Sequence, residues 1–137
     1  MIEGVTGPAN AEAARSATLR APAKADALPL VRLFAASVGR RVDLPPEVVE
    51  DLRLALTEVC SAAVEAARSE DDVMTVTMNL LIEGDTLMVR VSSSSAFSAG
   101  DPASDDRGRL LDALRLDVHM IEQGHGLELA IPRTSPR

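Results

Sequence analysis

The sequence contains no tryptophan or tyrosine, and the only aromatic residues among its 137 are Phe34 and Phe97. The hydrophobic core must therefore be built mainly from Leu, Val, Ile, Met and Ala side chains. The same scarcity removes the aromatic platforms on which single-stranded nucleic acids stack. A chain of this length has the size of one domain and can bury a core of its own.

Cysteine and long apolar runs are also scarce. Cys60 is the only cysteine, so no disulfide can form within the chain, and its place in an apolar helical pattern predicts a small buried hydrophobe. No apolar run approaches the ~18 residues of a membrane span. The N-terminus lacks the basic and apolar segments of a signal peptide. We therefore expect a cytoplasmic protein without a membrane partner.

Basic residues are too few to form a stripe. The chain has 21 Asp and Glu against 14 Lys and Arg, and its formal net charge is −7. This balance argues against direct binding of nucleic acid. A basic protein partner fits better, although an acidic surface often only keeps a protein soluble. Lys24 is the only lysine beside thirteen arginines, which together with the abundant alanine indicates a high-GC genome.

Hydrophobic periodicity predicts the element order β-α-α-β-β-α-β-β. The helices are expected at residues 27–40, 44–68 and 107–116, and the strands at residues 16–21, 73–83, 87–92, 118–122 and 127–131. Residues 1–15 and 133–137 are expected to be flexible tails around one domain at residues 16–132. An α+β two-layer sandwich buries these faces economically, with a mostly antiparallel sheet and its helices on one face.

Polar residues predict how these elements begin and end. Asp26 and Asp43 precede the first two helices and are expected to cap them. Gly84-Asp85 predicts a tight turn between two strands. Residues 92–104 are rich in Ser, Gly and Pro and predict a mobile loop. Its serines at 92–95 could be phosphorylated, or could simply be part of a flexible loop.

One helical segment carries a family resemblance. LRLALTEVCSAAVEAA, residues 52–67, resembles the N-box helix of the GHKL (Bergerat-like) ATPase fold, specifically that of anti-sigma factors of the RsbW/SpoIIAB type. The family pattern there is Glu, three residues, Asn-Ala, two residues, and His. Glu58 and Ala63 match this pattern, whereas Ala62 replaces the Asn and Ala66 replaces the His. With the closing block LLDALRLDV, the resemblance extends over roughly residues 16–132.

The resemblance implies a kinase-type nucleotide site in which residues that bind magnesium and adenine in the family are replaced. In the family the Glu is the general base and the Asn oxygen holds Mg²⁺ against the triphosphate, from one face of the helix. Ala62 has no oxygen for this hard cation, and Glu58 would then be a vestigial catalytic residue. Ser93 stands about where the family's adenine-reading Asp belongs. We therefore expect no ATP or Mg²⁺ cofactor.

In the family, a glycine-rich segment before the last helix covers the phosphates, and this phosphate lid departs from the family pattern as well. Gly108 remains from the glycine-rich segment, but Asp105 and Asp106 beside it would repel a triphosphate. We expect Val and Leu side chains from neighbouring elements to fill the space beside Glu58.

The metal-site candidates are weak. His119 and His125 with one cysteine make a poor ligand set, and no metal is expected. Gly124 and Gly126 predict turn geometry, because no helix follows them as in a phosphate loop.

The resemblance implies a partner-switching role in a stress or developmental response. Such a protein binds an alternative sigma factor of the sigma-B class and is released by a STAS-domain anti-anti-sigma partner. Family members are usually homodimers, and Arg32 matches an arginine that they place on the first helix, where the partner surface lies. The alternatives are an active serine/threonine protein kinase that phosphorylates the STAS partner with Glu58 as base, and a regulator that binds only STAS proteins.

Overall fold

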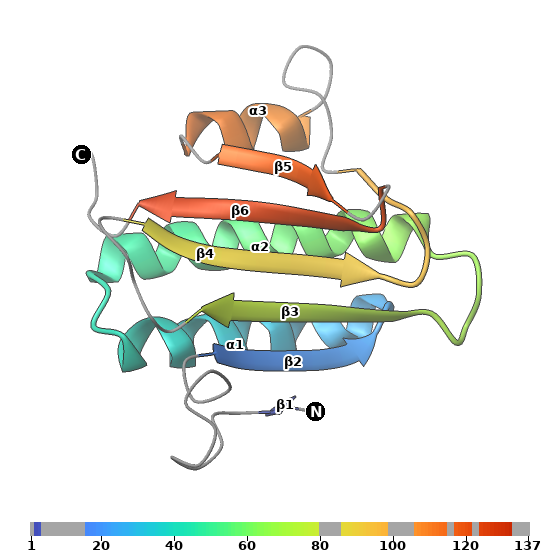
Figure 1. Cartoon of the computed structure of the whole chain (residues 1–137), viewed down its shortest axis with the longest axis horizontal. Helices are drawn as coiled ribbons and strands as arrows, with labels where there is room; N and C mark the ends of the chain where they lie inside the picture. Colours follow the sequence, from blue (N-terminus) through green and yellow to red (C-terminus); the bar gives the residue numbers. More distant parts are fainter. Residues whose placement is uncertain are drawn as a thin grey trace.

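The computed structural model describes residues 2–3, 16–79, 86–98, 106–114, 117–121 and 124–132. Within them, one antiparallel sheet has the strand order β1-β2-β3-β4-β6-β5 (Figure 1). Its strands are β1 Ile2–Glu3, β2 Ser16–Pro22, β3 Val73–Asn79, β4 Thr86–Ser93, β5 Asp117–Ile121 and β6 Gly126–Pro132. The helices are α1 Leu28–Arg41, α2 Pro46–Ala66 and α3 Asp106–Ala113, with a 3-10 turn at Ala25–Ala27 before α1.

The two long helices cover one face of the sheet, and α3 lies at its β5 edge (Figure 1). The predicted α+β architecture with a mostly antiparallel sheet is confirmed. The apolar stripes of both helices are buried against the sheet as their spacing predicts, through Val31, Phe34, Ala35, Val38, Val48, Leu52, Ala55, Val59 and Ala63. At Gly39 the two helices come so close that a Cβ atom there would lie 2.9 Å from Val49 Cγ2.

The central strands alternate between buried and more exposed residues, as a sheet covered on one face requires. In β4, Leu87, Val89 and Val91 are buried, while the residues between them are half-buried or exposed. The predicted hairpins are both present, since β3 pairs with β4 and β5 pairs with β6. The turn predicted at residues 84–85 lies outside the described residues.

The sequence pattern did not predict β1. Ile2 pairs with Leu19 and Glu3 with Thr18, so two residues of the expected N-terminal tail extend the sheet next to β2.

The two predicted aspartate caps are wrong. Asp26 lies inside the 3-10 turn that precedes α1, and the residue at the helix N-cap is Ala27. Pro45 occupies the N-cap of α2, and Asp43 instead ends α1 with a positive φ of 58°. The Leu44 amide donates to the Gly39 carbonyl, and the Asp43 amide donates to the carbonyl of Arg40. This is the Schellman pattern, in which an aspartate here takes the left-handed position that glycine usually holds.

The segment after β4 is more firmly held than the serine-rich composition predicts. The Ser94 amide donates to the Val73 carbonyl (3.1 Å), and the Phe97 amide donates to the Gly124 carbonyl (2.8 Å). Phe97 is buried. The predicted loop thus begins inside β4, which extends to Ser93, and its residues 99–104 lie outside the described residues. Gly124 has φ 90°, which confirms the predicted turn geometry.

None of the helices in the described part of the chain combines the length and the apolar character that crossing a membrane requires.

Candidate functional site

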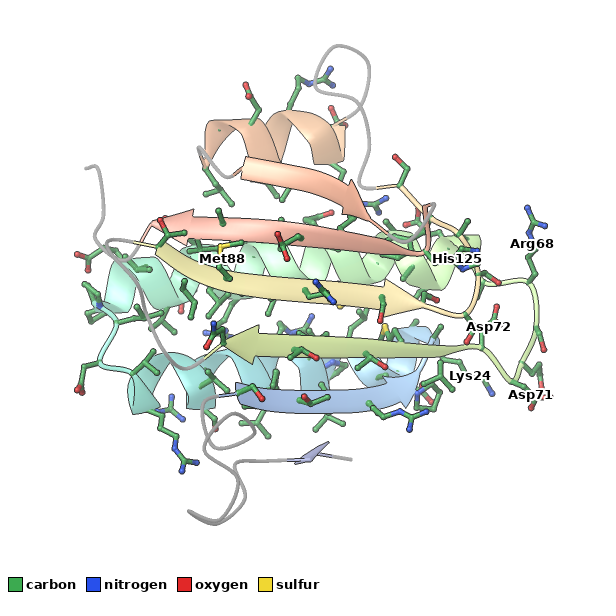
Figure 2. All side chains as sticks on the ribbon, in the orientation of Figure 1. Lys24, Arg68, Asp71, Asp72, Met88 and His125 are labelled. Atoms are coloured by element: carbon green, nitrogen blue, oxygen red, sulfur yellow. The ribbon has the colours of Figure 1, made fainter. Side chains whose placement is uncertain are left out.

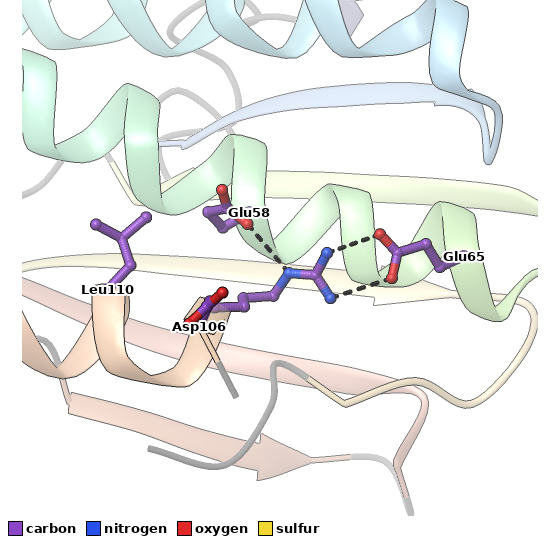
Figure 3. Close-up of a pocket in the computed structure, with 5 residues that line it drawn as sticks. Glu58, Glu65, Asp106 and Leu110 are labelled. Atoms are coloured by element: carbon purple, nitrogen blue, oxygen red, sulfur yellow. Dashed lines mark hydrogen bonds and ion pairs between the residues drawn. The ribbon is translucent and has the colours of Figure 1, made fainter. Parts of the chain in front are cut away.

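The site begins with a cavity of about 420 Å³ between α2 and α3. Its walls come from two helices that are far apart in the sequence: Glu58 and Glu65 on α2, and Asp106, Arg107 and Leu110 on α3 (Figure 3). Glu58 and Glu65 are seven residues apart, which is about two helical turns, so they project from the same side of α2. The α3 residues close the opposite wall.

Arg107 crosses this cavity and binds both glutamates. Its Nε donates to Glu58 Oε2 at 3.1 Å. Its two terminal nitrogens donate to the two carboxylate oxygens of Glu65, at 2.8 and 3.4 Å. Figure 3 shows the guanidinium lying between the two carboxylates. We call these three residues the Arg107 clasp, and its bidentate half is the stronger kind of arginine–carboxylate contact.

The clasp is only partly shielded from water. The Arg107 side chain is 17% exposed, whereas Glu58 is 32% and Glu65 66% exposed. Hydrogen bonds to Glu65 raise the pKa of Arg107 above its ordinary value; burial opposes this rise, and the hydrogen bond to Glu58 adds to it. The guanidinium therefore stays charged wherever the protein is folded.

The charges of the cavity do not balance. Three carboxylates, those of Glu58, Glu65 and Asp106, face one guanidinium among the lining residues. Asp106 also pairs with Arg109 of the same helix. The wall is therefore acidic even with Arg107 in place, and an anionic group would be repelled from it.

The N-box positions lie beside the clasp. Ala62 follows Glu58 by one helical turn, is 4% exposed and belongs to the core. Ala66 is half-buried against the same core. Our expectation that Val and Leu fill the space beside Glu58 is wrong: Arg107 enters it, and Leu110 is the one aliphatic residue in the lining.

Arg107 is the functional-site residue that the sequence did not predict. Nothing in the segment DDRGRLL singles it out, because its partners Glu58 and Glu65 lie 49 and 42 residues away. Gly108, predicted as the remnant of the lid, is buried within α3.

Ser93 lies apart from this cavity, at the end of β4. It is 8% exposed, and its Oγ has no hydrogen-bond partner among the described residues. Its backbone is paired, because its amide donates to the His125 carbonyl at 2.8 Å, and its carbonyl lies 3.2 Å from His125 Nδ1.

The remaining candidates do not gather around Glu58. Arg32 is half-buried on α1 and is not among the residues lining the cavity. His119 lies in β5, paired in register with Glu128, and His125 lies in the turn before β6. Within the described ranges, no group of three or more His, Cys, Asp or Glu is placed to hold a metal ion. Cys60 is completely buried, which raises the pKa of its thiol to about 12.

A second carboxylate organises the turn after α2. Asp72 Oδ2 accepts hydrogen bonds from Ser95 Oγ (2.6 Å), the Arg68 amide (2.8 Å) and the Ser69 amide (3.3 Å). We call residues 67–72 with Ser95 the Asp72 turn. Figure 2 places Asp72 toward the same end of the sheet as His125, opposite Met88. The hydrogen bond from Ser95, followed by those from the backbone, lowers the pKa of the Asp72 carboxyl.

Known proteins resemble this chain both at the level of a domain family and as individual relatives. Residues 21–130 match the model of the histidine kinase-like ATPase domain. A serine-protein kinase RsbW of Listeria monocytogenes is 35% identical over 77 residues, which are 56% of this chain and 49% of that protein. The serine-protein kinase RsbW of Bacillus subtilis (strain 168) is 28% identical over 111 residues, 81% of this chain and 69% of that protein. The chain thus spans about half the length of the Listeria relatives it matches. These matches confirm the predicted resemblance to RsbW-type proteins and the predicted ATPase-type fold.

Proposed function

Because this chain belongs to the histidine kinase-like ATPase domain family, we propose that it is an anti-sigma factor whose nucleotide site is degenerate. In this proposal it sequesters an alternative sigma factor of the sigma-B class, and a STAS-domain anti-anti-sigma partner releases it. Control then lies in competition between protein partners, without phosphorylation by this chain.

The observation that carries the proposal is Ala62, one helical turn after Glu58 on α2. Ala62 brings no oxygen to the face where a magnesium ion would need one. Glu58 keeps its carboxylate, and in this structure its Oε2 accepts a hydrogen bond from Arg107. The described residues around Glu58 therefore do not fit a magnesium–triphosphate group.

Charge supports the same conclusion. A triphosphate would meet the carboxylates of Glu58, Glu65 and Asp106, of which the first two share Arg107 and the third pairs with Arg109. Protein partners are less affected by this loss, because a binding surface on a fold is separate from its ligand site. Arg32 on α1 remains the proposed partner contact, and a homodimer or a complex with the partner is the proposed assembly.

Nucleotide binding and kinase activity form the first test. The purified chain is titrated with Mg-ATP in a thermal-shift assay and then incubated with its STAS partner and radiolabelled ATP. We expect no shift and no label on the partner. Label that disappears in Glu58→Gln would establish the active kinase instead, and this is the alternative that the names of the relatives favour.

Partner binding forms the second test. The chain, tagged and expressed in its own cell, is purified together with whatever remains bound, and the sigma and STAS proteins are identified by mass spectrometry. We expect both classes of protein, with Arg32→Ala weakening at least one of them. Recovery of STAS proteins alone would favour the regulator that has lost its sigma surface. If neither sigma nor STAS proteins are recovered, the proposal is overturned.

A further inference from the structure

The helix α3 is attached to the rest of the protein by few side chains. Among its eight residues only Gly108 and Leu111 are buried. A helix this short is not stable by itself, because too few backbone hydrogen bonds offset the cost of its first turn. Its position must therefore come from tertiary contacts, which include the buried Leu111 and Leu114, a residue directly after α3 that packs against the core.

The second attachment is ionic, and it comes from one residue. Arg107 reaches two carboxylates on α2, with one hydrogen bond to Glu58 and two to Glu65. Arg109, two residues further along α3, instead pairs with Asp106 within its own helix. The two arginines are thus alike in chemistry, but only the first connects α3 to another element.

We propose that Arg107 is a latch: its guanidinium holds α3 docked against α2, and its release lets α3 leave that position while the sheet, α1 and α2 stay folded. The docked state holds the Glu58 and Glu65 carboxylates of α2 through Arg107. The undocked state frees both carboxylates from Arg107, so any partner that binds only one of the two states shifts the balance between them. This inference goes beyond the proposed function and does not depend on it.

The latch has the physical properties that a reversible contact needs. Its charges are partly exposed, with Glu65 66% and Glu58 32% accessible. Salt therefore screens it, in contrast to a fully buried ion pair. The apolar anchor at Leu111 is insensitive to salt in this way, so the two attachments can be separated by experiment.

The test is hydrogen exchange by mass spectrometry on the full chain without any partner. We compare the wild type with Arg107→Gln and with Arg109→Gln, the matched control on the same helix. In Arg107→Gln we expect the amides of α3 to exchange faster by up to about fivefold, the factor that losing a partly exposed ion pair implies. Amides of β3 and β4 should keep their wild-type rates in both variants.

Further variants keep the proposal falsifiable if Arg107→Gln lowers overall stability. Glu65→Gln keeps Arg107 and its contact with Glu58, and should give an intermediate rate in α3. Arg107→Lys, which keeps the charge without the planar fork, should restore part of the protection. In wild type, 1 M NaCl should speed exchange in α3, and in Arg107→Gln it should not.

Several outcomes would overturn the latch. One is equal exchange in Arg107→Gln and Arg109→Gln. A second is α3 in the wild type exchanging as fast as an unfolded chain, and a third is faster exchange in the sheet together with α3. Because no sigma or STAS protein is present, failure here leaves the proposed function standing, and failure of partner binding leaves the latch standing.

Discussion

Two carboxylate-centred contacts lie along the second half of α2 and the turn that follows it, and they hold the chain by different means. In the Asp72 turn, one carboxylate accepts from a hydroxyl and from two backbone amides three and four residues away. In the Arg107 clasp, two carboxylates bind a guanidinium that is 42 and 49 residues distant in sequence. Neutral donors, two of them local, hold the Asp72 turn, whereas an ion pair between two helices can open without unfolding either.

Replacing Asp72 by alanine is expected to cause the largest loss of stability. Without Asp72, the Ser95 hydroxyl and the Arg68 and Ser69 amides would lose their acceptor. A donor left without an acceptor destabilises the folded state by more than the net contribution of the hydrogen bond itself. We expect the Tm to fall by roughly 5 °C or more, measured by circular dichroism. Asp71→Ala removes the neighbouring exposed carboxylate and should leave the Tm almost unchanged. Equal losses in the two variants would contradict the role of Asp72.

Acid should remove part of the same stabilisation from the wild type. The pKa of Asp72 is lowered in the folded state, mainly by the hydrogen bond from Ser95. Its contribution is therefore fully present above the ordinary aspartate pKa of about 3.9, and is lost as the pH falls through the lower folded-state value. We expect the Tm of the wild type to fall more steeply than that of Asp72→Asn below about pH 4. Parallel curves would show that Asp72 is not the group responsible.

The guanidinium of the clasp does not contribute to this acid effect. The pKa of Arg107 is raised, so its stabilisation is present below the ordinary arginine value and is lost only above it, in strong alkali.

Arg107→Gln should cost much less in global stability than Asp72→Ala. Partly exposed ion pairs contribute little to the free energy of unfolding, and we expect a loss of about 1 kcal/mol or less. Urea denaturation followed by circular dichroism measures it, with Arg109→Gln as the control expected to show no change. A loss in Arg107→Gln as large as that in Asp72→Ala would mean that the clasp stabilises the whole fold and not α3 alone.

Salt should produce the smallest effect and the cleanest contrast. At 1 M ionic strength the screening length is only about 3 Å, so the difference in Tm between the wild type and Arg107→Gln should shrink toward zero. The difference between the wild type and Asp72→Ala should persist, because most of its hydrogen bonds come from neutral donors in a partly buried turn. If both Tm differences shrink alike, the Arg107 clasp is no more ionic in character than the Asp72 turn.

Much of the fold was predictable, because it depends on local periodicity. The helical stripe from Val48 to Ala63 and the alternation in β4 are properties of consecutive residues, and both are buried as their spacing requires. Helix ends were harder to predict. Asp43 was taken for a cap of α2 because aspartate is common there, but its backbone adopts the left-handed geometry that ends α1.

The candidate site was predicted only in part. Glu58 could be recognised from its position in the N-box pattern, and Ala62 from what it lacks. That Ser95 belongs to an ordered turn could not be predicted from composition, because its partner Asp72 lies 23 residues earlier, before two intervening strands. The clasp was missed for the same reason, since nothing in the order of residues brings Arg107 to Glu58.

The sequence alone determined the layers of this protein: which helix faces are apolar, which strands alternate, and that the N-box helix keeps its Glu58 while lacking the Asn and the His. These features depend on the spacing of residues within one element. Burying the apolar face of that element stabilises the folded state wherever the element lies. Only the tertiary structure decided which side chain pairs with the Glu58 carboxylate. A charge is stabilised by whatever stands within a few ångströms of it, and the folded chain places Arg107 there.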